Sequence, residues 1–205
     1  MKKICSGLLI CLLSTAIHAQ TLIFEWAKSM GGSSTEISKC ITVNTSDYIY
    51  ITGSFNGTVD FDPGAATFNL ISSGGEDVFV QKLDANGNFI WARSMGGMSN
   101  EIGRSITTDA SGFVYITGYF EGTADFDPSI AIFNLTSNGV DDVFILKLDD
   151  LGNLIWAKSI GGVGSDRSFS ITCDIISAAP HDNCLLVSVN VSPGSSMANT
   201  GFISS

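Results

Sequence analysis

Two carboxylate pairs occupy the same position in two similar stretches of the chain, and they are the first candidates for chemistry. The motif Asp60-Phe-Asp62-Pro63 recurs as Asp125-Phe-Asp127-Pro128. In an extended segment, residues two apart point to the same side, so each pair could bind Ca²⁺ if backbone oxygens completed a shell of six to eight ligands. The alternative, which we favour, is an Asp-Pro turn whose carboxylates accept backbone N–H groups. The sequence predicts no other metal site or cofactor; the candidate calcium ligands are Asp60, Asp62, Asp125 and Asp127.

Other acidic residues also recur and are predicted to serve the fold. Asp84 and Asp149 each begin an Asp-x-x-Gly-Asn turn. A carboxylate at that position can accept the turn amides and fix the register of a hairpin. The pairs Glu76-Asp77 and Asp141-Asp142 directly precede predicted strands, and we expect them to be solvated loop charge.

A nucleophile-and-base mechanism has little support in the residues. His18 lies in a predicted signal peptide, so a Ser-His-Asp triad would depend on His181 in a divergent tail. Two carboxylates suffice for glycoside hydrolysis, but the strongest candidate acids recur in each repeat, which fits a structural role better than one catalytic centre. We therefore predict no catalytic residue and no enzyme activity. The alternative is a secreted polysaccharide-active enzyme or a fragment of one.

The elements that position these residues come from an internal repeat. The three tryptophans, Trp26, Trp91 and Trp156, stand 65 residues apart, and each begins a similar stretch that ends in Gly-Gly. Residues 24–88 align with residues 89–153 without a gap, and 38 of the 65 positions are identical. A third repeat can be followed from Leu154 through Thr172 and stops matching near Asp174.

Within each repeat the residues predict two hairpins. In one hairpin, residues 78–84 and 89–94 are rich in β-branched and aromatic residues and flank a Gly-Asn turn. Residues 105–108 and 113–120 flank another glycine-containing turn, and residues 123–135 read as an extra short hairpin or a long loop. A tandem four-stranded unit predicts an all-β fold of antiparallel β-propeller blades. A β-solenoid is the alternative, although its coils are usually shorter.

Two stretches resemble a known family. Residues 143–158 read Val-Phe-Ile-Leu-Lys-Leu-Asp-Asp-Leu-Gly-Asn-Leu-Ile-Trp-Ala-Lys and precede Gly161-Gly162. Residues 109–118 read Asp-Ala-Ser-Gly-Phe-Val-Tyr-Ile-Thr-Gly and precede Asp125-Phe126. Over about residues 24–174 the chain resembles the SBBP family of bacterial β-propeller repeats. The resemblance implies a propeller-type fold in exported bacterial proteins, often long surface proteins, and implies no particular activity.

The repeats divide the chain into five parts. These are a signal peptide (1–19), blade repeat 1 (20–88), blade repeat 2 (89–153), a partial repeat 3 (154–174) and a divergent tail (175–205). Two blades and part of a third cannot close a ring of four to eight blades. Three explanations stay open: a truncated or frameshifted piece of a longer propeller protein, self-association that completes the ring, or a tail that forms a divergent cap.

The N-terminus predicts export. Met1-Lys2-Lys3 is positively charged, Ile4–Ile17 is apolar, and Ala19 offers a small residue for cleavage, which is typical of a secretory signal peptide. The apolar run is shorter than the roughly 20 residues that span a bilayer. We therefore predict a secreted or cell-surface protein with no membrane span after cleavage. Three cysteines would remain, and whether they form a disulfide stays open: Cys40, Cys173 and Cys184.

Composition narrows the set of partners. The chain has 10 Lys+Arg against 20 Asp+Glu, a net charge of −10, and loss of two lysines with the signal peptide would make it about −12. Phosphate backbones and anionic membranes attract clustered cations, so we predict no nucleic-acid partner. A hydrophobic content of 44% and 22 glycines fit a chain with a buried core and many tight turns.

These observations together predict an exported, non-catalytic β-propeller repeat protein that acts as a surface or extracellular interaction scaffold. Rigid blades would present loops to a protein, a glycan or a neighbouring copy. The expected binding edge is the pair of loops Gly31–Glu36 and Gly96–Glu101.

Overall fold

The computed structural model describes residues 25–173, 184–190 and 202–204. This part of the chain is all-β, with antiparallel sheets and no helix, and hence no helix suited to crossing a membrane. The strands in chain order are β1 (Gly31–Gly32), β2 (Glu36–Val43), β3 (Ile49–Phe55), β4 (Thr58–Asp60), β5 (Asn69–Ile71), β6 (Asp77–Leu83), β7 (Phe89–Gly97), β8 (Glu101–Thr108), β9 (Val114–Phe120), β10 (Thr123–Asp125), β11 (Asn134–Thr136), β12 (Asp142–Leu148), β13 (Leu154–Ile160), β14 (Arg167–Cys173), β15 (Cys184–Asn190) and β16 (Phe202–Ser204).

Two four-stranded units form the body of the molecule. In the first sheet β2, β3, β6 and β7 pair in chain order, and in the second sheet β8, β9, β12 and β13 do the same. The hairpins predicted from residues 78–94 and 105–120 are present as β6–β7 and β8–β9. Alternating β-branched and aromatic residues suit these pleated surfaces because each sheet buries side chains on its faces.

Each sheet carries an inserted short hairpin between its second and third strands, β4–β5 in the first and β10–β11 in the second. β10 also pairs with the end of β7, and β4 pairs with β1 in the same way. A Cβ on Gly97 would lie 2.3 Å from the carbonyl oxygen of Thr123, and one on Gly32 would lie 2.3 Å from that of Thr58. The Gly-Gly pairs are therefore needed where two backbones approach closely.

The inserted hairpins send one phenylalanine each into the core. Phe126 packs against Phe120 and Phe144, with ring centroids 5.3 and 4.9 Å apart. Phe61 makes the equivalent contacts with the first sheet. Phe61 is 2% exposed and Phe126 is fully buried, so both rings belong to the apolar core.

A third sheet consists of β14, β15 and β16. β14 follows β13 as β8 follows β7, and it pairs with β15 through a register that includes Ile171 opposite Val187. Residues 174–183, 191–201 and 205 lie outside the described part of the chain, so the tail predicted from residue 175 is described only at β15 and β16.

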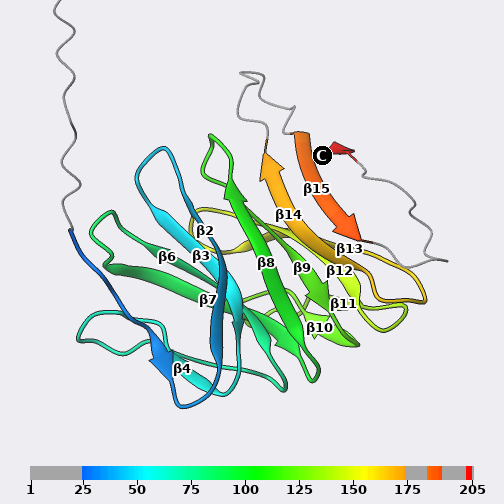
Figure 1. Cartoon of the computed structure of the whole chain (residues 1–205), viewed down its shortest axis with the longest axis horizontal. Helices are drawn as coiled ribbons and strands as arrows, with labels where there is room; N and C mark the ends of the chain where they lie inside the picture. The colour runs from blue at the N-terminus through cyan, green and yellow to red at the C-terminus, as the bar shows by residue number, and fades with distance from the viewer. Residues whose placement is uncertain (1–24, 174–183, 191–201, 205) are drawn as a thin grey trace, which may run out of the picture.

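The sheets lie face to face along the chain. β8 contacts β2 and β3 of the first sheet, and β14 contacts β8 and β9 of the second. Figure 1 shows β2, β8 and β14 following one another across the front of the molecule. Two apolar cores fill the seams. The seam between the first and second sheets includes Tyr50, Val78, Val80, Ile106, Ile116, Phe120, Phe126 and Phe144, and that between the second and third includes Tyr115, Val143, Ile145, Ile171, Cys173 and Val187.

The sheet unit is offset from the sequence repeat. The boundary drawn at 88/89 from sequence alignment falls in the turn between β6 and β7, whereas the first sheet runs from Glu36 to Gly97. A repeat can be cut at any point of its period, and a hairpin turn carries the clearest sequence signal. Sequence comparison therefore places the boundary there, while hydrogen bonding groups the strand after the turn with the strand before it.

The thiols whose side chains are described are free. Cys40 is partly buried and Cys173 is buried, and neither forms a disulfide. Burial raises the pKa of the Cys173 thiol to about 12, and the nearby Asp109 acts in the same direction. The side chain of Cys184 lies outside the described part.

Replacing Phe126 should test the role of the inserted hairpin. We expect Phe126→Ala to lower the free energy of unfolding by about 3–5 kcal/mol, because a fully buried ring leaves a cavity. Urea denaturation measures the change. Phe169→Ala is the matched control, since that ring is 54% exposed, and its cost should stay below about 1 kcal/mol. Equal costs for the two variants would contradict the packing described.

Candidate functional site

The candidate calcium ligands organise the start of each inserted hairpin loop. The carboxylate of Asp60 accepts the backbone N–H groups of Asp62, at 3.0 Å, and Phe68, at 2.8 Å. Asp62 in turn accepts the N–H of Gly64 at 2.7 Å. The same contacts recur 65 residues later: Asp125 accepts from Asp127 and Phe133, and Asp127 accepts from Ser129.

These contacts bear on both interpretations of the motif. The hydrogen bonds from the backbone of Phe68 and Asp62 hold the pKa of Asp60 below its ordinary value, so the carboxylate is negative in either role. Within the described ranges no three His, Cys, Asp or Glu side chains come together to hold a metal ion. A Ca²⁺ ion at either pair would therefore draw most of its shell from backbone and water oxygens. Calcium binding at Asp60, Asp62, Asp125 and Asp127 stays a prediction.

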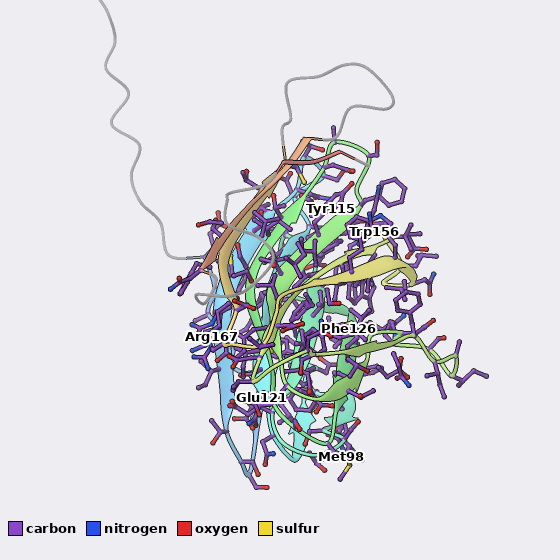
Figure 2. The ribbon with its side chains drawn as sticks, turned by 90° about the vertical axis from the view of Figure 1, so that its right-hand side faces the viewer. Met98, Tyr115, Glu121, Phe126, Trp156 and Arg167 are labelled. Atoms are coloured by element: carbon purple, nitrogen blue, oxygen red, sulfur yellow. The ribbon has the colours of Figure 1, made fainter. Side chains whose placement is uncertain are left out.

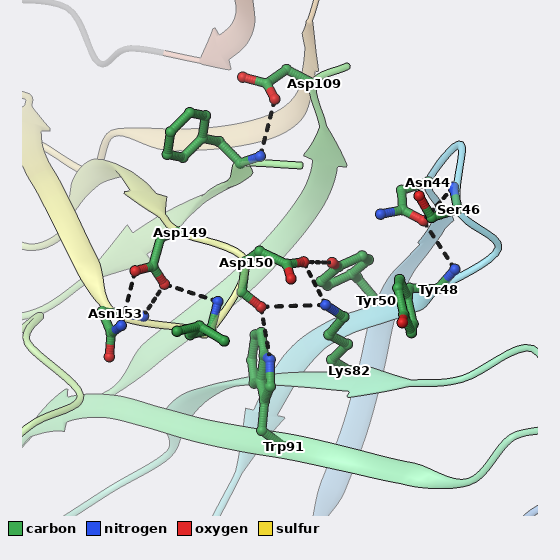
Figure 3. A network of polar contacts seen from close by, with 12 residues as sticks. Asn44, Ser46, Tyr48, Tyr50, Lys82, Trp91, Asp109, Asp149, Asp150 and Asn153 are labelled. Atoms are coloured by element: carbon green, nitrogen blue, oxygen red, sulfur yellow. Dashed lines mark hydrogen bonds and ion pairs between the residues drawn. The ribbon is translucent and has the colours of Figure 1, made fainter. Parts of the chain in front are cut away.

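A second polar network joins the first and second sheets through one turn residue, Asp150 (Figure 3). Its carboxylate accepts the hydroxyl of Tyr50 at 2.9 Å and forms an ion pair with Lys82. Its backbone carbonyl accepts Lys82 Nζ at 3.3 Å and the indole N–H of Trp91 at 3.1 Å. Three residues of the first sheet thus converge on one turn of the second.

Burial sets the electrostatics of this network. The side chain of Lys82 is only 4% exposed, and its ammonium group lies 4.2 Å from the ring centroid of Tyr48. Burial alone would raise the pKa of Asp150, but the hydrogen bonds from Lys82 and Tyr50 outweigh burial and lower it. Burial and the hydrogen bond to Asp150 together raise the pKa of Tyr50. The network therefore consists of a carboxylate, an ammonium and a neutral phenol.

The turn that holds Asp150 is built by its neighbour Asp149. One Asp149 oxygen accepts the backbone N–H groups of Leu151 and Asn153, and the other accepts the Asn153 side-chain amide. Asp84 does the same in the first sheet. Gly152 has a φ of 80°, and a Cβ there would lie 3.2 Å from the ring of Trp91. The expectation that these acids fix hairpin turns is confirmed.

The tryptophans clamp successive turns. Trp91 donates to the carbonyl of Asp150, and Trp26, 65 residues earlier, donates to the carbonyl of Ala85 at 3.1 Å. Asp150 is replaced by alanine at the earlier turn, so only the backbone half of the network repeats there. The tryptophan spacing, read from the sequence as a repeat marker, is a spacing of contacts between neighbouring units.

Several buried acids were missed by sequence reasoning. Asp77, Asp141 and Asp142 were expected as solvated loop charge, yet each is at most 1% exposed, and Glu101 is fully buried. Burial is the main cause that raises the pKa of Asp77 to about 6 and that of Glu101 to about 8; the charge of Asp77 adds to the effect on Glu101. The sequence signal available was position, because these acids stand where a strand begins beside a Gly-Gly loop.

The seam acids cap those loops. Glu101 accepts the N–H of Gly97 at 2.7 Å, and Asp166 accepts that of Gly162 at the same distance. Glu36 holds Gly32 in the same way. In the second sheet Asp141 pairs with Arg167 of β14. The predicted loop edge at Gly96–Glu101 is thus anchored at its glycine end and exposed at Met98, which Figure 2 shows at one extremity of the molecule.

The loop of the second inserted hairpin exposes two isoleucines. Ile130 is fully exposed and Ile132 is 74% exposed in the loop between β10 and β11. Beside this loop lies a groove of about 260 Å³ that continues onto β5 and β7. The groove is lined by Phe68, Leu70, Ala92, Arg93, Ser94, Pro128, Ser129 and Asn153. It combines an apolar floor with few charged groups, which suits binding better than acid–base chemistry.

Removing the Asp150 carboxylate should weaken the seam. We expect Asp150→Ala, which makes this turn like the first, to cost about 2 kcal/mol of unfolding free energy because buried Lys82 loses its partner. Adding Lys82→Met should recover about half of that loss. Urea denaturation of the single and double variants measures both. A neutral Asp150→Ala variant would contradict the network.

The buried acids should make stability depend on pH. Since the pKa of Glu101 is raised from 4.5 to about 8, the folded chain holds a proton that the unfolded chain releases, and stability falls as pH rises from about 4.5 to 8. Glu101→Gln should flatten this decline, measured as unfolding free energy at pH 5, 6.5 and 8.

Glu36→Gln is the matched control, because Glu36 makes the same hydrogen bond on a more exposed edge. A decline with pH that is as steep in Glu101→Gln as in the unmodified chain would contradict this assignment.

Comparison with known proteins agrees with a repeat architecture. No family model matches the chain. It is 28% identical over 143 residues to an uncharacterized WD repeat-containing protein, L264, of Acanthamoeba polyphaga mimivirus, covering 65% of this chain and 10% of that protein. It is 25% identical over 147 residues to the regulatory protein FlaEY of Caulobacter vibrioides, covering 71% and 15%. The chain thus spans a small part of each relative, and both names describe repeat or regulatory proteins.

Proposed function

We propose that this chain is an exported, non-catalytic scaffold of β-propeller type, in which stacked blades display variable loops to a protein ligand. The all-β stack of four-stranded sheets and the similarity to a WD repeat-containing protein support the propeller architecture. The N-terminus, in which two lysines precede an apolar run, supports export.

The observation that carries the proposal is where the two repeats differ. In the inserted hairpin the residues on either side of the tip are the same, Asp-Phe-Asp-Pro before it and Phe-Asn-Leu after it. The tip itself reads Gly-Ala-Ala-Thr at 64–67 and Ser-Ile-Ala-Ile at 129–132. Ile130 and Ile132 are exposed. Sequence therefore varies where no fold contact restrains it and where a partner could touch it.

The acids support the absence of catalysis in this proposal. The carboxylates most suited to hydrolysis, Asp60 and Asp125, accept the same two amides in each repeat. A catalytic pair would instead place one acid and one base in different environments. The apolar character of Ile130 and Ile132 favours a protein surface over a sugar, since glycans stack best on exposed aromatic rings.

Exchanging the tip should separate display from fold. We expect Ile130→Ala with Ile132→Thr, the residues of the first repeat, to weaken capture of its protein ligand at least tenfold and to leave the melting temperature within about 2 °C. The measurement is retention of envelope and culture proteins of the source organism, quantified by mass spectrometry. Ile71→Thr, another exposed position (67%) outside the tip, is the control.

The alternative function, a polysaccharide-active enzyme, can be tested with the same protein preparation. Incubation with cellulose and chitin should release no reducing ends. Release that is lost when Asp60, Asp62, Asp125 or Asp127 is replaced in one repeat only would overturn the scaffold in favour of a polysaccharide-active enzyme. Equal protein capture by the unmodified chain and the tip variant would remove the assigned binding surface.

A further inference from the structure

On the outer face of the first sheet β2 is open, although β3, β6 and β7 are covered there by the inserted hairpin β4–β5 and its loop. Ile41, Ile106 and Ile171 stand 65 residues apart at equivalent positions in β2, β8 and β14. Ile106 is 3% exposed and Ile171 is 4% exposed, because the preceding sheet lies on each, whereas Ile41 is 62% exposed. Val43, which is 57% exposed and pairs with Ile49, extends this exposed strip on the same face of β2. A contiguous apolar strip of this kind marks an interaction surface.

The segment before β2 occupies the position of an outer blade strand. Residues 25–32 correspond to β7 one repeat earlier: β1 pairs with β4 as the end of β7 pairs with β10, and Trp26 clamps a turn as Trp91 does. β7 pairs along its length with β6. In the described part of the chain, residues 25–30 pair with no strand.

The third sheet is the complement of that strand. It contains β14, β15 and β16 in the positions of the first three strands of a blade, and the described residues supply no fourth. Among the described residues, the third sheet therefore has a free edge on β16, and residues 25–30, which correspond to an outer strand, pair with no strand. An unpaired strand edge is a template for pairing with another chain.

We propose that a second copy of this chain covers the open face. The β14–β16 sheet of one copy takes residues 25–32 of the next as its fourth strand and lies on the strip of Ile41 and Val43. The inference rests on the blade architecture proposed above and on no assumption about the displayed ligand. The occupant is a sheet of the same kind because the same face already receives such a sheet at both seams within the chain.

The described sheets give the stoichiometry expected for the 205-residue polypeptide. With the shared blade, its described residues contribute three four-stranded sheets, so two copies of this polypeptide provide six. Six lies within the roughly four to eight blades of closed propellers, whereas three and nine do not. The interface is head-to-tail, and it occurs twice in a symmetric pair.

The internal seams also predict which residues meet. At the second seam the hydroxyl of Ser105 accepts the backbone N–H of Ile171 at 3.2 Å. At the first seam the thiol of Cys40 takes the place of that serine and lies 3.9 Å from the carbonyl oxygen of Ile106. Ser170 is the next residue in this series, and it is exposed. Ser170 of one copy should therefore contact Ile41 of the other.

Mass measurement tests the association. Light scattering at 50 µM should give a particle of two chains, and Ile41→Asp should raise the dissociation constant at least 100-fold because it places a charge in an apolar seam. The side chain of Ile41 is exposed in a single chain, so the variant should keep its circular dichroism and cooperative unfolding. Ile130→Asp, on an exposed loop, is the matched control and should remain a pair.

Three outcomes would overturn the proposal: a monomer of the unmodified chain at that concentration, a particle of three or more chains, or a pair that survives Ile41→Asp. A monomer whose strip is protected from hydrogen exchange would mean that residues 1–24 of the same chain cover it. Failure of ligand capture by the loops would leave the pair intact, so the two proposals fail separately.

Cross-linking tests the direction of the interface. In a Cys40→Ser background, matching the serine present at Ser105 and Ser170, one preparation carries Ile41→Cys and a second carries Ser170→Cys. Oxidation of the mixture should form disulfide-linked pairs of chains. Either preparation oxidised alone should give no more linked chains than the Cys40→Ser parent. Disulfide formation by Ile41→Cys alone would mean that two open faces pack on each other, and would refute the head-to-tail arrangement.

Discussion

The whole architecture depends on one constraint, that each four-stranded sheet must be covered by its neighbour. A sheet of this size has two apolar faces and cannot bury both by itself. The seam between the first and second sheets solves this with Ile106 and Phe144 packed under Tyr50 and Val78. Asp150 then locks the seam from the turn side, because Tyr50, Lys82 and Trp91 all bind it. The covering recurs at the second seam, whereas the Asp150 carboxylate is replaced by Ala85 one repeat earlier, where only the tryptophan contact recurs.

That constraint explains how the chain uses its acids. Asp84 and Asp149 hold turns, Asp60 and Asp125 hold inserted loops, and Glu101 and Asp166 hold glycine loops. A carboxylate with two or three N–H partners is committed to its loop. The fold thereby leaves the loop tips as the positions that are free to differ, and Ile130 replaces Ala65 there without any change in the residues beneath.

How far the sequence predicted this structure depends on whether the signal was local. The turns at Gly87 and Gly152 were predictable because a positive φ favours glycine, and the hairpins follow from them. Asp84 and Asp149 were placed correctly because each accepts amides of its own turn, a few residues away. Asp77 and Glu101 were not, because their burial comes from the Gly-Gly loop and the next sheet, which are distant in sequence. The exposure of Ile41 was equally hidden, since Ile41 and Ile106 are identical residues in similar local sequence.

The acids buried between the sheets cost the stack free energy because they lose water, and the same cost applies to Glu36 if the outer face of the first sheet is covered. At the first seam Asp77 and Glu101 are buried together, and at the second Asp142 is buried near Asp141 and Asp166; in both, burial first and like charge second raise the pKa of an acid. Glu36 holds the equivalent position on the open face, where it is only partly buried. A sheet that covers Ile41 must also bury Glu36, as the first sheet buries Glu101. Burying a carboxylate is costly unless hydrogen bonds replace its water. Glu36 already accepts the N–H of Gly32 at 2.8 Å, as Glu101 accepts that of Gly97, so the hydrogen bond that offsets part of this cost is in place before the face is covered.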